Sequence, residues 1–158
     1  MDSFNPQEIL RIAIEVEEGG FNFYQSLESK TKNEKIKNIC RDLKEQEKEH
    51  KKTFEDMLDN ISDYIADDYS PGEYTAYLKA IASEYIFTQR LTAQKIKEGF
   101  DDDLAAIEFA IYIEKESILT YTALKEYALT GDQPAINSLI DQERKHLVDL
   151  IALKQAIN

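Results

Sequence analysis

The chain contains two histidines, and a glutamate stands three residues before each of them. Glu47 precedes His50, and Glu143 precedes His146. Because 18 of the 158 residues are glutamate, two such placements are expected by chance in roughly one per cent of cases. Residues three apart on a helix project from the same face, so each pair can offer a carboxylate oxygen and an imidazole nitrogen to one region of space.

Both pairs lie on an apolar helical stripe. The first pair continues the stripe that runs from Leu43 to Phe54, and the second continues the stripe that runs from Ile140 to Leu150. A buried carboxylate without a partner is costly, so these positions imply either a bound cation or a strongly raised pKa. The alternative interpretation is a polar network that satisfies itself without any metal.

Two further glutamates are candidates for the same interior space. Glu17 lies on the apolar stripe of the first helical segment, whereas Glu15 and Glu18 lie beside it. In the second half of the chain, both Glu114 and Glu116 stand among apolar residues, so burial alone does not choose between them.

An internal repeat favours Glu114. The segment from Ala13 to Glu17 matches the segment from Ala110 to Glu114 at an offset of 97 residues, and the two Glu-x-x-His pairs are related by an offset of 96. We therefore expect an internal duplication, about 7–60 and 101–157, joined by a crossover over 61–100. The same alignment matches Tyr24 with Tyr121, which we interpret either as core packing or as hydrogen-bond donors to the site carboxylates.

The two halves together supply four carboxylates and two imidazoles, which suits a dimetal centre whose ions lie about 3.5–4 Å apart. Two divalent ions would neutralise the four carboxylates. Oxygen and nitrogen ligands suit iron or manganese, and zinc could occupy the same site. The predicted metal ligands are Glu17, Glu47, His50, Glu114, Glu143 and His146.

The elements that must position these residues are helices. Gly and Pro together make up only eight residues, and the apolar spacing is helical in five segments, about 6–30, 33–60, 73–98, 101–129 and 133–156. The fold class is therefore all-α: a four-helix bundle with a long crossover that contains an additional helix, in one domain over 1–158. Gly19 and Gly20 interrupt the first segment, which indicates that a neighbour needs space there.

Composition excludes some classes of protein. The formal charge of −12 argues against nucleic-acid binding, because phosphates require clustered cationic side chains. Cys40 is the only cysteine, so no intrachain disulfide is expected and a reducing cytoplasm is predicted. The first ten residues lack the apolar core of a secretory signal, and no apolar stretch is long enough to span a membrane.

Four segments carry a resemblance to a known family: Ala13–Glu17 (AIEVE), Glu45–His50 (EQEKEH), Glu114–Ile118 (EKESI) and Asp141–His146 (DQERKH). In combination and order, they resemble the rubrerythrin-like branch of the ferritin-like superfamily. This resemblance implies a di-iron site that reacts with dioxygen or hydrogen peroxide, with roles in peroxide reduction, ferrous oxidation and storage.

The sequence departs from that family in two ways. It has no Cys-x-x-Cys pairs, so we expect neither a rubredoxin-type domain nor an internal electron donor, and we expect electrons to come from an external donor. Rubrerythrins carry an additional glutamate where this chain has Ser117, and Gly20 takes the equivalent place in the first half. These small residues either leave an open approach for a small oxidant or only allow close helix packing.

The leading hypothesis is a non-haem di-iron oxidoreductase of the peroxidase or ferroxidase type. One alternative is a protein that binds, sequesters or senses iron or manganese without turnover, and another is a metal-free helical interaction module. Because related bundles commonly self-associate, a homodimer is also expected.

Overall fold

The structure is a computed structural model that describes residues 6–61, 72–126 and 128–157, and those residues form helices, turns and loops without any strand. Five helices follow one another along the chain: α1 (Pro6–Lys30), α2 (Glu34–Asn60), α3 (Gly72–Glu98), α4 (Asp103–Lys125) and α5 (Gln133–Ile157). The all-α prediction is confirmed.

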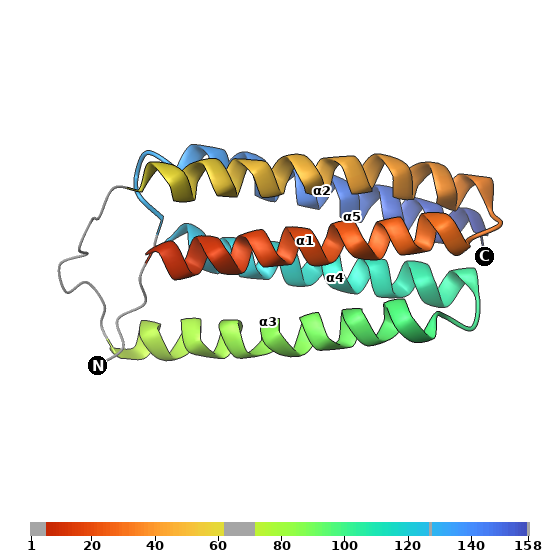
Figure 1. Ribbon diagram of the computed structural model, residues 1–158, viewed down its shortest axis with the longest axis horizontal. Helices are drawn as coiled ribbons and strands as arrows, with labels where there is room; N and C mark the ends of the chain where they lie inside the picture. The colour runs from red at the N-terminus through yellow and green to blue at the C-terminus, as the bar shows by residue number, and fades with distance from the viewer. Residues whose placement is uncertain (1–5, 62–71, 127, 158) are drawn as a thin grey trace.

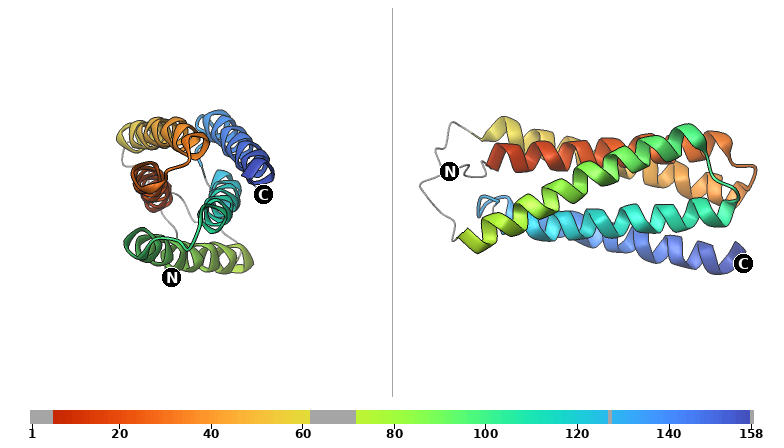
Figure 2. Two further views of the ribbon diagram at one scale, coloured as in Figure 1. Left: turned by 90° about the vertical axis from the view of Figure 1, so that its right-hand side faces the viewer. Right: turned by 90° about the horizontal axis from the view of Figure 1, so that it is seen from below.

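The helices form a four-helix bundle with one extra helix (Figure 1). Helices α1 and α2 make one antiparallel hairpin, and α4 and α5 make the other. The end view in Figure 2 shows α3 lying across α1 and α4, on the side of the bundle away from α2 and α5. The predicted crossover helix is therefore present, and it covers one face of the bundle.

Local capping explains several helix ends. The Asn33 side chain accepts hydrogen bonds from two backbone amides in the first turn of α2, and the Asp102 side chain accepts one from Ala105 N at 2.7 Å. Gly99 ends α3 with a positive φ of 79°, a conformation that favours glycine. The part of the predicted crossover over 62–71 lies outside the described residues.

Helix α4 is shorter than predicted, since it ends at Lys125 and not at about Leu129. The Ala128 amide still reaches the Leu124 carbonyl at 3.1 Å, but Asp132 N then bonds to Leu129 O and turns the chain. Leu129 and the two residues after it are exposed, so this segment has no apolar face whose burial would extend the helix.

The apolar core consists of two clusters, one toward each end of the bundle. One contains Phe23, Ile36 and Ile107, and the other contains Phe54 and Ile136, each with further apolar neighbours from the four bundle helices. Between the two clusters, the same helices turn glutamates and histidines inward.

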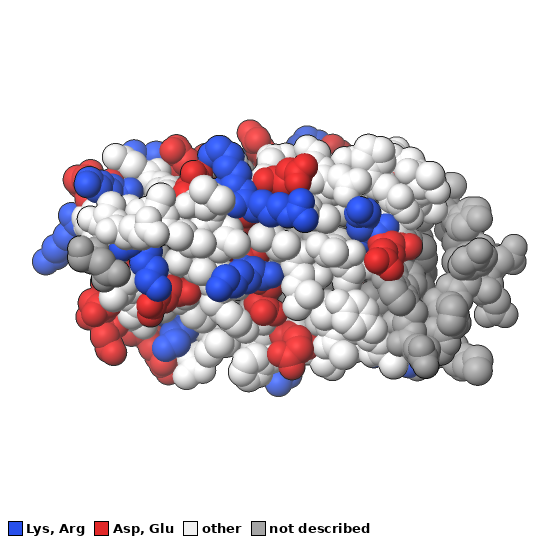
Figure 3. All heavy atoms as spheres, turned by 180° about the vertical axis from the view of Figure 1, so that it is seen from behind, with Lys and Arg blue, Asp and Glu red and all other residues white. Residues whose placement is uncertain are grey.

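The outer surface is charged. On the face seen from behind in Figure 3, basic and acidic side chains are interspersed. Within the described part of the chain, no helix has a window both long enough and apolar enough to cross a membrane.

Candidate metal centre

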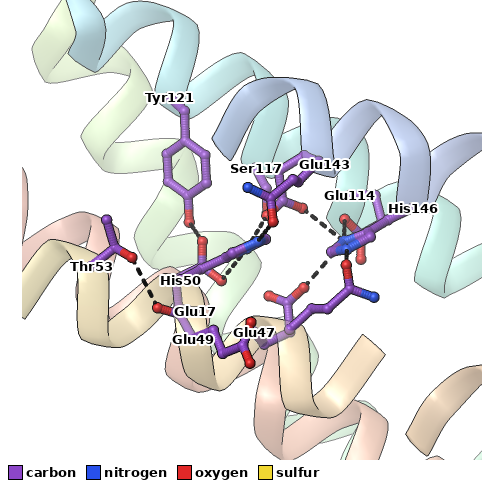
Figure 4. A network of polar contacts seen from close by, with 12 residues as sticks. Glu17, Glu47, Glu49, His50, Thr53, Glu114, Ser117, Tyr121, Glu143 and His146 are labelled. Atoms are coloured by element: carbon purple, nitrogen blue, oxygen red, sulfur yellow. Dashed lines mark hydrogen bonds and ion pairs between the residues drawn. The ribbon is translucent and has the colours of Figure 1, made fainter. Parts of the chain in front are cut away.

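The structure brings all six predicted ligand residues together in the middle of the bundle (Figure 4). One comes from α1, two from α2, one from α4 and two from α5. None of them has more than 3% of its surface exposed. The six residues are Glu17, Glu47, His50, Glu114, Glu143 and His146. Glu116 is only half-buried and does not belong to this cluster, so the choice of Glu114 by symmetry agrees with the geometry.

The cluster divides into two overlapping groups of four residues, in each of which the ligand atoms lie within 4.8 Å of one another. The first group is Glu17, Glu47, His50 and Glu143, and the second is Glu47, Glu114, Glu143 and His146. Because Glu47 and Glu143 belong to both groups, each of them can contact two neighbouring ions. This arrangement has the donors of a carboxylate-bridged pair of metals.

The Nδ1 atoms of both imidazoles face the carboxylates. His50 Nδ1 lies 2.8 Å from Glu143 Oε1, and His146 Nδ1 lies 3.3 Å from Glu143 Oε2 and 3.4 Å from Glu47 Oε1. The two rings are stacked, with centroids 5.5 Å apart and planes inclined by 14°. Each histidine therefore aims one nitrogen at a different half of the same interior space.

Two glutamines orient the histidines. His50 Nε2 lies 3.0 Å from Gln142 Oε1, and His146 Nε2 lies 3.1 Å from Gln46 Oε1. A glutamine oxygen only accepts hydrogen bonds, so Nε2 carries a proton and Nδ1 faces the cluster, where it can bind a metal once it has lost its own proton. The sequence analysis missed both glutamines, although each directly precedes a ligand glutamate and the repeat relates them.

The two tyrosines matched by the repeat donate hydrogen bonds to Glu17 and Glu114, the two glutamates that each belong to only one ligand group. Tyr24 donates a short hydrogen bond to Glu114 Oε1, and Tyr121 donates one of 2.5 Å to Glu17 Oε1. In both cases, the tyrosine comes from one half of the chain and the glutamate from the other. The bonded oxygen is held away from the centre, which leaves Oε2 of each carboxylate facing the cluster.

Several inward-facing atoms make no hydrogen bond within the described part of the chain. Across the residues that the structure describes, seven buried side-chain oxygens and nitrogens are of this kind, and all seven belong to the six clustered residues. Their nearest polar neighbours are one another, because two imidazole Nδ1 atoms face five carboxylate oxygens at 2.8–3.5 Å, and two nitrogens are too few to satisfy five oxygens. Two divalent cations would supply the missing partners and would balance four carboxylates beside neutral imidazoles, so these residues fit a dimetal centre.

Burial and mutual repulsion disturb the protonation of the cluster without metal. Burial, with Glu143 close by, raises the pKa of Glu17 well above its usual value and raises that of Glu114 to about 8. Burial also acts on Glu143, but its contacts with the imidazoles outweigh burial and lower its pKa. Burial alone would lower the pKa of His146, whereas its carboxylate neighbours raise it to about 12.

Gly20 and Ser117 border a cavity of about 20 Å³ between α1, α3 and α4. Glu47 and Glu114 form part of the wall of this cavity. A Cβ atom on Gly20 would lie 2.6 Å from Glu47 Oε2, so the carboxylate occupies the space that the glycine leaves. Ser117 also lines the cavity and donates its hydroxyl hydrogen bond to Ile113 O at 3.0 Å. Gly20 therefore makes room for a packed side chain, whereas Ser117 lines the cavity beside the cluster.

A comparison with known families decides the classification. The Rubrerythrin family profile matches residues 8–154, which is nearly the whole chain. The chain belongs to the rubrerythrin family. Its fold is also similar to the crystal structure of a Thermotoga maritima protein that is provisionally described as a ferritin-like diiron-carboxylate protein. The TM-score is 0.72 with 25% sequence identity, over 100% of this chain and 99% of that one.

No functionally curated protein matches the chain. Family membership, the similarity to a diiron-carboxylate protein and the buried Glu/His cluster all point to a dimetal site. The rubrerythrin-like, ferritin-like fold expected from the four sequence segments is confirmed.

Proposed function

We propose that this rubrerythrin-family protein binds two iron ions through the six clustered residues and transfers electrons from an external donor to hydrogen peroxide or dioxygen. The observation that carries the proposal is the pair of overlapping ligand groups, whose inward-facing atoms make no hydrogen bond in the described part of the chain. When bound, a ferrous pair supplies two electrons, which together with two protons convert one hydrogen peroxide into two waters.

The protein's part in this reaction is to hold the ions in fixed places. Glu47 and Glu143 contribute to both groups and are the candidates to bridge, whereas Glu17 and Glu114 each contribute to one. Manganese or zinc would accept the same donors, so the identity of the metal belongs to the proposal.

Neighbouring residues decide which donor atoms face the ions. The Tyr24 and Tyr121 hydroxyls hold Oε1 of Glu114 and Glu17, so that Oε2 stays available to a metal. Gln46 and Gln142 do the same for the histidines by holding Nε2–H. Because neighbouring residues hold these ligands in place, the ligands need little rearrangement when the charge of the centre changes.

The size of the cavity beside the site favours a small oxidant. The six side chains are almost fully buried, which excludes bulk water, while the cavity beside Gly20 and Ser117 comes up to Glu47 and Glu114. Such a cavity has room for about one water-sized molecule. Hydrogen peroxide and dioxygen, with two heavy atoms each, are close to this size.

The test is anaerobic loading with ferrous iron, followed by rapid mixing with hydrogen peroxide. We expect two iron ions per chain and reoxidation much faster than that of free ferrous iron, followed by the near-ultraviolet absorption of ferric protein. Glu47→Gln should lose iron and the fast reaction. Glu49→Gln is the matched control, since Glu49 lies two residues away and is exposed.

The nearly complete burial of the cluster also suits a second function, the binding or sensing of iron or manganese without turnover. Two ions per chain combined with reoxidation no faster than that of free ferrous iron would favour this second function. A protein that takes up no metal would overturn both.

A further inference from the structure

The adjacent glycines of α1 each make room for a side chain from a different helix. A Cβ atom on Gly20 would meet the Glu47 carboxylate of α2, as described above, and a Cβ atom on Gly19 would lie 2.7 Å from both amide atoms of Gln89 on α3. The two glycines therefore seat a candidate metal ligand and a residue of the crossover helix side by side.

Gln89 belongs to the wall of the cavity that comes up to the cluster. On the inner side, this wall is formed by Glu47, Glu114 and Ser117, and on the outer side by the α3 residues Tyr85, Thr88, Gln89 and Thr92. Helix α3 thus forms one wall of the cavity, and Gln89 is a half-buried side chain of that wall.

The neighbours of Gln89 on α3 are fixed by hydrogen bonds. Tyr85 donates to Glu15 at 3.2 Å, Thr88 and Tyr112 share a hydrogen bond of 3.2 Å, and Thr92 donates to the Thr88 carbonyl. No hydrogen bond to another described residue fixes the Gln89 amide. A change of rotamer at Gln89 therefore breaks none of these bonds, and such changes are fast for side chains that reach the surface.

From this arrangement, we propose that the cavity between Gly20, Ser117 and Gln89 is the binding site for the oxidant, and that the Gln89 side chain admits molecules of two or three heavy atoms and excludes bulkier ones. This inference rests on the proposed function, because it assigns the entry route and the size of its substrate. The cavity of about 20 Å³ has room for about one water-sized molecule, which is close to the size of hydrogen peroxide and far below that of an aromatic hydroperoxide.

The first test measures binding without turnover. The protein is loaded with cobalt(II) and mixed with azide, and the visible absorption of cobalt follows ligand entry. Gln89→Ala should raise the association rate constant for azide by about tenfold, because the side chain no longer occupies the entry route for most of the time. Gln94→Ala is the matched control, since Gln94 lies on the exposed side of the same helix.

A second variant should act in the opposite direction. Ser117→Val fills the cavity and should slow azide entry by about tenfold. Its control is Thr122→Val, which removes a hydroxyl that bonds to the Ile118 carbonyl on the exposed side of α4, much as Ser117 bonds to the Ile113 carbonyl. With iron, Gln89→Ala should also admit cumene hydroperoxide, which the unaltered protein should reject relative to hydrogen peroxide.

The cobalt content separates the two proposals. If two cobalt ions bind per chain, but Gln89→Ala and Ser117→Val match their controls in azide entry, the access site is wrong and the dimetal function survives. If the unaltered protein takes up no cobalt or iron, both are wrong. Opposite shifts for the two variants at unchanged cobalt content support the access site.

Discussion

The hydrogen bond between His146 Nε2 and Gln46 Oε1 gives a sharp test of how the centre is assembled. Gln46→Leu keeps the approximate size of the side chain but removes the acceptor at 3.1 Å. His146 is fully buried, so water cannot replace that acceptor. An unsatisfied buried N–H costs about 1–3 kcal/mol.

This cost should appear mainly in the metal-loaded protein, because a bound ion fixes the ring with Nε2 turned outward. Without metal, the ring can turn its N–H groups toward the carboxylates around it. The expected result is metal affinity weakened by about 10- to 100-fold, in line with the free energy above. His146 belongs to only one of the two ligand groups, so one ion should be weakened and the other should bind nearly as before.

The assay is an anaerobic competition titration of cobalt(II) against a chromophoric chelator, which resolves two binding steps. Gln46→Glu retains an acceptor oxygen and should keep the affinity that Gln46→Leu loses. Gln94→Leu serves as a control on an exposed helix face. Unaltered binding of both ions by Gln46→Leu, or equal weakening in the Leu and Glu variants, would refute the orienting role.

Three further results are expected. Gly20→Ala should weaken metal binding by more than about tenfold by displacing the Glu47 carboxylate, while circular-dichroism melting of the metal-free protein shows no loss, because alanine favours the helix by about 1 kcal/mol. Tyr121→Phe should lower the free energy of unfolding in urea by about 1–3 kcal/mol, because it leaves a buried oxygen of Glu17 unbonded. The metal-free protein should also lose stability between about pH 5 and pH 9, because the pKa of Glu114 is raised from 4.5 to about 8.

The sign of the pH effect follows from proton binding. Native Glu114 keeps a proton that the unfolded chain releases above its ordinary pKa of 4.5, so the stabilisation is present at lower pH and is lost as pH rises through about 8. Denaturation with urea at several pH values measures this trend, and metal-free protein that gains stability with rising pH would contradict it. For the variants, a cooler melting transition of metal-free Gly20→Ala, or an unchanged Tyr121→Phe, would count against the contacts assigned to them.

Much of this architecture can be predicted from the sequence because ionisable residues on an apolar stripe have few inexpensive explanations. Burial alone left Glu114 and Glu116 undecided, and the repeat selected the residue that the structure places in the cluster. The end of α4 could not be predicted from helical spacing, since apolar residues continue to Leu129, which the structure leaves exposed. The contact between Gly19 and Gln89 could not be predicted either, because Gln89 belongs to a helix about 70 residues away in sequence.

The supporting contacts reveal how the two hairpins depend on each other. Each of the four hydrogen bonds that orient a ligand crosses from one hairpin to the other: two run from tyrosine to glutamate, and two join histidine to glutamine. A single hairpin carries a lone glutamate and a Glu-x-x-His pair, but the tyrosine and glutamine that orient these ligands belong to the other hairpin. Buried carboxylates without such partners are unfavourable, so correct docking of the hairpins and correct aim of the ligands require the same bonds. The site therefore cannot be assembled within one hairpin and then docked, since its ligands are oriented only once both hairpins are in contact.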